Sequence, residues 1–89
     1  MKTIRKGLDE EIAEGFDWSD HLEVNEILEA STWTIDAGLT GSDATYDNFT
    51  TEIVLSGGTQ NDTYKVQNEV TTSAGLVYEK SFKVLVVER

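Results

Sequence analysis

The chain has 89 residues, no cysteine, no proline and a formal net charge of −10. A chain of this length makes one domain, here residues 1–89, with a small core, and the lack of cysteine excludes disulfides and cysteine-based metal sites. The acidic composition disfavours binding to nucleic-acid phosphates or to anionic lipid head groups, and no apolar run predicts a signal peptide or a membrane span.

The first thirty residues allow two interpretations. Leu8, Ile12 and Phe16 recur at a helical spacing, which favours an amphipathic helix. Gly15 between them, and the aromatic pair of Phe16 and Trp18, favour strands instead. We predict a strand near residues 3–6, a second near residues 12–18 and a loop through residues 20–26. Met1 followed by Lys2 fits a translation start, so we expect the whole chain to be the mature protein.

From Ser31 onward, apolar residues recur at every second position, which is the period of a half-buried strand. Turn-forming glycine, serine, asparagine and aspartate separate the alternating runs. Short strands with frequent turns predict a β-sandwich or barrel. The residues expected to share inward faces are Trp33 and Ile35; Phe49, Ile53 and Leu55; Tyr64, Val66 and Val70; and Tyr78, Phe82, Val84 and Val86.

A local motif narrows this fold class. Leu55 ends one strand, a glycine turn follows, and Tyr64 begins the next strand. That layout is typical of a tyrosine corner, in which the phenol hydroxyl bonds a backbone group a few residues upstream. Trp33 stands where immunoglobulin strand C carries its core tryptophan. We therefore predict an all-β, immunoglobulin-like sandwich of about seven strands, with Trp33, Leu55, Tyr64, Val66, Val70, Phe82 and Val84 in its core.

Catalytic chemistry finds little support in the sequence. The single histidine, His21, lies within five residues of Asp17, Ser19 and Asp20, whereas a catalytic triad needs groups that converge from different parts of the fold. We predict that the protein is not an enzyme and has no cofactor. Carboxylates around residues 17–26 and in other turns are explained by turn formation, with a calcium site as the alternative. Trp18 is a core residue or, alternatively, an exposed aromatic for sugar stacking.

The ordered motifs of the chain resemble those of small immunoglobulin-like structural and accessory proteins of tailed bacteriophages and prophages. The matching runs are Phe16-Asp17-Trp18-Ser19-Asp20, Ser31-Thr32-Trp33-Thr34, Gly38-Leu39-Thr40, Leu55-Ser56-Gly57-Gly58-Thr59, Tyr64 to Gly75, and Lys80-Ser81-Phe82 leading to Val86-Val87-Glu88-Arg89. The chain departs from the pattern at His21, where members often carry a tryptophan or an apolar residue, and at Asp36, where they often carry proline.

The resemblance implies a virion protein, made in the host cytoplasm, that docks on capsid, neck or tail components and carries no catalytic residues. A homo-oligomer of the chain within the particle is a further possibility. Between Lys6 and Lys65 there is no lysine or arginine, while 14 of the 17 acidic residues lie there, which is explained by solubility or by docking on a basic surface.

Two segments are candidates for interaction. Residues 1–6, with Lys2, Arg5 and Lys6, form either an anchoring arm that adds a strand to a partner's sheet or an ordinary first strand. The loop with Trp18, Asp20 and His21 is the second candidate. A carbohydrate- or host-surface-binding module that uses this loop, and a calcium-stabilised interaction domain, are the alternative functions.

Overall fold

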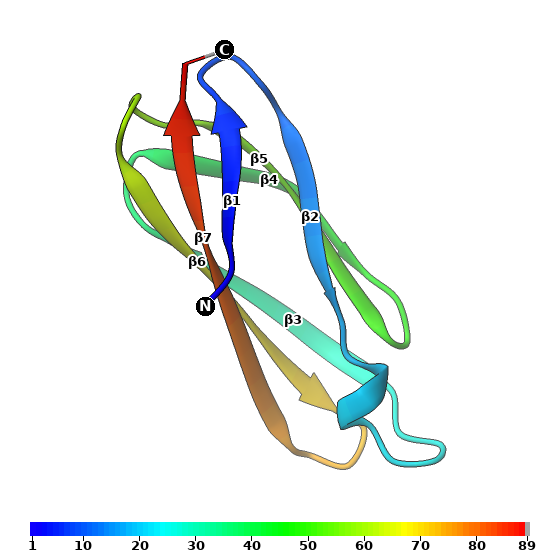
Figure 1. Cartoon of the computed structure of the whole chain (residues 1–89). Coiled ribbons are helices and arrows are strands. Elements are labelled where there is room, and N and C mark those ends of the chain that lie inside the picture. The colour runs from blue at the N-terminus through cyan, green and yellow to red at the C-terminus, as the bar shows by residue number, and fades with distance from the viewer. Residues whose placement is uncertain (89) are drawn as a thin grey trace.

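The computed structural model describes residues 1–88, which form two facing sheets (Figure 1). One short 3-10 helix, η1 (Ser19–His21), follows the second strand. The strands are β1 (Thr3–Gly7), β2 (Ile12–Asp17), β3 (Leu28–Ile35), β4 (Leu39–Tyr46), β5 (Thr50–Gly57), β6 (Thr63–Thr72) and β7 (Val77–Val87). The strands predicted near residues 3–6 and 12–18, and the loop after them, are confirmed, and the helical alternative is wrong.

The strand order is that of an immunoglobulin-like sandwich. One sheet has the order β1-β7-β6-β3 and the other the order β2-β5-β4. β1 runs parallel to β7, with Thr3 opposite Lys83, and the other pairs are antiparallel. The predicted fold class is confirmed. Both sheets bury one face, and this explains why the apolar residues of β5, β6 and β7 alternate with polar ones.

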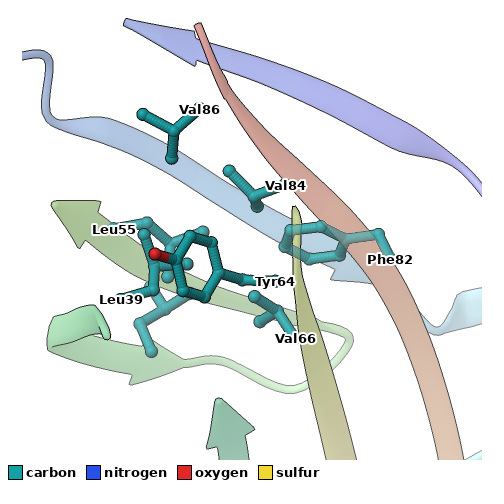
Figure 2. Close-up of a cluster of buried hydrophobic side chains, with 8 residues drawn as sticks. Leu39, Leu55, Tyr64, Val66, Phe82, Val84 and Val86 are labelled. Atoms are coloured by element: carbon teal, nitrogen blue, oxygen red, sulfur yellow. The ribbon is translucent and has the colours of Figure 1, made fainter. Parts of the chain in front are cut away.

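The main core lies between the sheets around the ring of Tyr64 (Figure 2). Thr59 donates its backbone N–H to the Tyr64 hydroxyl over 2.8 Å, and this confirms the tyrosine corner. The tyrosine ring also needs a bare backbone beside it, because a Cβ on Gly38, where φ is +108°, would lie 2.9 Å from Tyr64 Cε1. The buried members of this cluster are Leu39, Ile53, Leu55, Tyr64, Val66, Phe82, Val84 and Val86.

A second, smaller core cluster lies toward the other end of the sandwich. It consists of Trp18, Leu28 and Val70. Trp18 is completely buried, whereas Trp33 is only half-buried and stacks on Phe16 with ring centroids 6.0 Å apart. Trp33, predicted as a core residue, thus packs against the main cluster but is not one of its fully buried members. Since Trp33 belongs to β3, an edge strand of its sheet, it packs against the rim of the main cluster.

The face predicted for Phe49 is also wrong. Phe49 lies just before β5 and its side chain is exposed, while Thr51 takes the buried position that begins the inward row of Ile53 and Leu55. Asp47 holds the turn before β5, accepting hydrogen bonds from the N–H groups of Phe49 and Thr50. Strand pairing with β2 starts only at Thr50, so strict alternation does not reach back to Phe49.

A buried polar network joins the two sheets. Asn68 of β6 accepts hydrogen bonds from Trp18 Nε1 at 3.2 Å and from Thr51 Oγ1 of β5 at 2.6 Å. Its amide donates to Ser31 Oγ at 2.9 Å and to the Thr32 carbonyl at 3.2 Å, both on β3. The Asn68 amide thus has partners for both its oxygen and its nitrogen, as a buried polar group requires. In a chain without cysteine, this network provides a specific cross-sheet link.

Candidate functional site

The basic N-terminal segment is an ordinary first strand. β1 is already paired with β7, and Leu8 continues the pairing through an N–H bond to the Val87 carbonyl at 3.2 Å. Lys6 is completely buried, and its ammonium donates to the carbonyls of Gly7 and Gly57, each at 2.8 Å. The prediction of Lys6 as an interaction residue is wrong, because its side chain is completely buried and its ammonium is bound to these backbone carbonyls.

Lys2 and Arg5 are exposed, as an interaction role requires. The ammonium of Lys2 lies 3.8 Å from a carboxylate oxygen of Glu14 on β2. The Lys2 side chain is largely in solvent, and an ion pair of this kind contributes little to stability. The two residues lie along the β1 edge of the four-stranded sheet, so their role in binding stays a prediction.

In the predicted loop site, only Asp20 and His21 are exposed. Trp18 is enclosed, with its indole N–H bonded to Asn68 and Thr51, and Lys80 Nζ lies 5.0 Å from its ring centroid. The His21 ring packs over the inner aromatic rings, with its centroid 5.6 Å from those of Trp18 and Tyr78. The core interpretation of Trp18 is therefore right, and the indole has no exposed face on which a sugar could stack.

Three loops instead come together at one end of the sandwich, the lower end in Figure 1. They are residues 18–27 between β2 and β3, 47–49 between β4 and β5, and 73–76 between β6 and β7. Trp18 donates its backbone N–H to the Phe49 carbonyl at 2.8 Å, and Leu28 donates to the Asn48 carbonyl at 2.9 Å. Ser73 donates to the Ile27 carbonyl at 2.8 Å. We call these three joined loops the loop platform.

Carboxylates in the loop platform and at its border with β2 hold its shape. Asp17 accepts the Ser19 N–H at 2.9 Å, and Glu26 accepts the Glu23 N–H at 2.8 Å as well as the Thr72 hydroxyl. These donors favour the charged form, so the Ser19 amide lowers the pKa of Asp17 and the Thr72 hydroxyl lowers the pKa of Glu26. The N–H groups of residues 49 and 50 lower the pKa of Asp47 in the same way.

The loop platform also exposes apolar side chains. Val24, at the tip of a tight turn closed by a Glu26 N–H bond to the Glu23 carbonyl, is 89% exposed. Phe49 is 47% exposed and Leu76 is 49% exposed. Asn25 adopts a φ of 68° in this turn, a backbone conformation that asparagine tolerates better than most residues. Val24 and Leu76 were not predicted as contact residues, although an apolar residue among turn-forming residues was a usable signal.

Two open hollows flank the Val24 turn. The larger, of about 520 Å³, is lined by Ser19, Leu22, Glu23, Val24, Asn25, Glu26, Ile27 and Phe49. The smaller, of about 280 Å³, shares residues 23–26 and adds Ser73, Ala74 and Leu76. The shared turn is therefore a ridge between the two hollows. Both linings carry Glu23 and Glu26, and neither includes a lysine or an arginine.

The carboxylates of Asp17, Glu26 and Asp47 accept hydrogen bonds from backbone and hydroxyl donors. Among residues 1–88, no group of three or more histidine, aspartate or glutamate side chains is placed to hold a metal ion. None of the helical structure in that range is long and apolar enough to cross a membrane. The loop platform thus presents exposed apolar side chains and carboxylates on loops that are joined by backbone hydrogen bonds.

Comparison with known proteins identifies the family. The model for the podophage GP4 fiber-tail adaptor protein gp77 family matches residues 6–85. The chain belongs to this family. It is thus a small immunoglobulin-like structural protein of phages and a component of the virion. The structural resemblance inferred from the sequence motifs is confirmed.

One solved structure shows the same fold in a distant sequence. The solution structure of the PKD domain from the KIAA 1837 protein matches with a TM-score of 0.64 and 18% identity, covering 99% of this chain and 80% of that one. At this identity the likeness concerns the fold alone. A search of curated proteins finds no match.

Proposed function

We propose that the protein is a non-enzymatic structural component of a phage tail that docks on other tail proteins through the loop platform. Membership of the fiber-tail adaptor family, over residues 6–85, is the observation that carries the proposal. It favours the tail over the capsid or neck as the place of docking. The protein would be made in the host cytoplasm and incorporated during assembly, in one or several copies per particle.

The loop platform supports this role. A docking protein needs exposed surface that is held in one shape, because ordering flexible loops on binding lowers affinity. The hydrogen bonds between the three loops, and the carboxylate caps within them, provide that order. The exposed Val24, Phe49 and Leu76 provide apolar contact area.

Fractionation of infected cells tests the proposal. We expect the protein in density-purified, salt-washed phage particles, at a constant ratio to the other tail proteins, and in tails separated from heads. Antibody labelling should mark the tail. Protein found only in the soluble lysate, or only in separated heads, would contradict a tail role.

A further inference from the structure

The chemistry of the loop platform indicates which kind of partner segment it receives. We infer that the hollows beside Val24 take up a large apolar side chain flanked by lysine or arginine, presented by another tail protein. This inference rests on the proposed function, and it adds the partner's chemistry and the part of this chain that contacts it.

The apolar part of the inference comes from exposure. Val24, Phe49 and Leu76 come from three loops that are far apart in sequence, yet they gather at one end of the molecule. Clustered exposed apolar residues with a polar rim mark interaction surfaces, whereas isolated ones do not. The larger hollow, of about 520 Å³, has Leu22, Ile27 and Phe49 in its lining, and Leu22 also packs on the buried cluster around Trp18.

The basic part of the inference comes from charge. Glu23 and Glu26 line both hollows, and the exposed Asp20 lies in η1 nearby. Glu26 is occupied by its bonds to Thr72 and to the Glu23 N–H, while Glu23 and Asp20 extend into solvent. Lysine or arginine beside the partner's apolar anchor would face these carboxylates. Complementary charge of this kind speeds encounter and disfavours wrong partners.

The loops that form the two hollows are held in place by hydrogen bonds, so a small contact surface is sufficient for binding. The Val24 turn is held by the Glu26 N–H bond to the Glu23 carbonyl and by the buried Glu26 carboxylate. The opposite loop is tied in by Ser73, which donates to the Ile27 carbonyl and accepts the Ile27 N–H at 3.0 Å. Neither hollow therefore has to form on binding, and the ordering cost falls mainly on the partner.

Photo-crosslinking in assembled particles tests where and what the platform contacts. A chain with p-benzoylphenylalanine in place of Val24 is expected to crosslink to another tail protein, at a peptide with a large apolar residue flanked by lysine or arginine. The matched control carries the same photoreactive residue in place of Leu8, which is 42% exposed at the opposite end, and should not yield that peptide. A crosslink from position 24 to a second copy of this chain, or to a peptide without basic residues, would overturn the inference.

Competition during assembly measures the contribution of each feature. Tagged Val24→Ser, and tagged Asp20→Asn with Glu23→Gln, compete with untagged wild-type protein for places in the particle. We expect each to be incorporated about ten-fold less than tagged wild type, as for a central interface contact. The controls, Leu8→Ser and Asp9→Asn with Glu11→Gln, make the same changes at the opposite end and should compete normally.

The outcomes separate the inference from the proposed function. Wild-type protein absent from washed particles would refute the proposed function and the inference with it. If wild-type protein is present in particles and all variants are incorporated as efficiently as tagged wild type, the inference alone is refuted. Thermal denaturation checks folding, and because the three substituted side chains are exposed we expect unchanged melting temperatures. If Val24→Ser alone were unstable, the result for the carboxylate variant would decide.

Discussion

Replacing Asn68 by alanine should destabilise the protein more than any single exposed substitution, because the amide joins the two sheets from inside. The change removes the partner of Trp18 Nε1 at 3.2 Å and of Thr51 Oγ1 at 2.6 Å. It also removes the donor to Ser31 Oγ and to the Thr32 carbonyl on β3. Trp18 Nε1 keeps only its longer contact to Thr51 Oγ1 at 3.3 Å.

The size of the loss in the free energy of unfolding follows from the polar groups that Asn68→Ala leaves without a partner. An unsatisfied buried polar group costs about 1–3 kcal/mol, and a cavity the size of a methyl group or larger costs about 1 kcal/mol more. We expect a loss of about 3 kcal/mol in the free energy of unfolding. A domain of this size has a total of about 4–13 kcal/mol, at roughly 0.05–0.15 kcal/mol per residue. The melting temperature should fall by about 12 °C or more, at roughly 4–8 °C per kcal/mol.

Urea unfolding followed by tryptophan fluorescence and circular dichroism measures the effect. Glu69→Ala is the matched control, because Glu69 is the next residue on β6 and its side chain is exposed; its change should stay within about 0.5 kcal/mol. A double-mutant cycle with Thr51→Val should give a coupling energy of about 1 kcal/mol or more. A loss below about 1 kcal/mol for Asn68→Ala, or independence from Thr51→Val, would refute the cross-sheet link.

Three further predictions concern single contacts and pH. Lys6→Met should lower the free energy of unfolding in urea by about 2 kcal/mol, because the carbonyls of Gly7 and Gly57 lose a charged donor that is itself completely buried. Lys83→Met, at an exposed position, should lower it by less than about 0.5 kcal/mol, and equal effects would contradict the role of Lys6. Tyr64→Phe should cost about 1 kcal/mol, since the Thr59 N–H loses its acceptor, and an unchanged urea midpoint would show that the corner hydrogen bond does not stabilise the fold. The pKa values of three carboxylates in or next to the loop platform lie below the ordinary values of 3.8 for aspartate and 4.5 for glutamate. The stabilisation that they provide is therefore present above those values and is lost as the pH falls through the lower folded pKa values. These carboxylates are Asp17, Glu26 and Asp47. The urea concentration at the midpoint of unfolding should therefore decrease when the pH is lowered below about 4, and Asp47→Asn should make that decrease smaller. A midpoint concentration that stays constant down to pH 3 would contradict the stabilising role of these carboxylate hydrogen bonds.

The recurrence of apolar residues at every second position of the strands was enough to predict most of the core. Leu55, Tyr64, Val66, Phe82 and Val84 are buried as the alternation requires, because side chains on one strand face opposite sides whatever the strand pairs with. The tyrosine corner could also be predicted, since its hydrogen bond spans only five residues, from Thr59 to Tyr64. These features depend on local geometry.

The tertiary structure alone decided which of the two tryptophans is completely buried and which lysine is buried. Trp18 is enclosed because β5 and β6 bring Thr51 and Asn68 to its indole, over 33 and 50 residues of sequence. Lys6 is buried because its ammonium meets the carbonyl of Gly57, which is 51 residues away. The loop platform likewise exists only where three turns meet at one end of the sandwich. Local periodicity fixes the direction of each side chain, but burial and site formation depend on which distant strands and loops become neighbours.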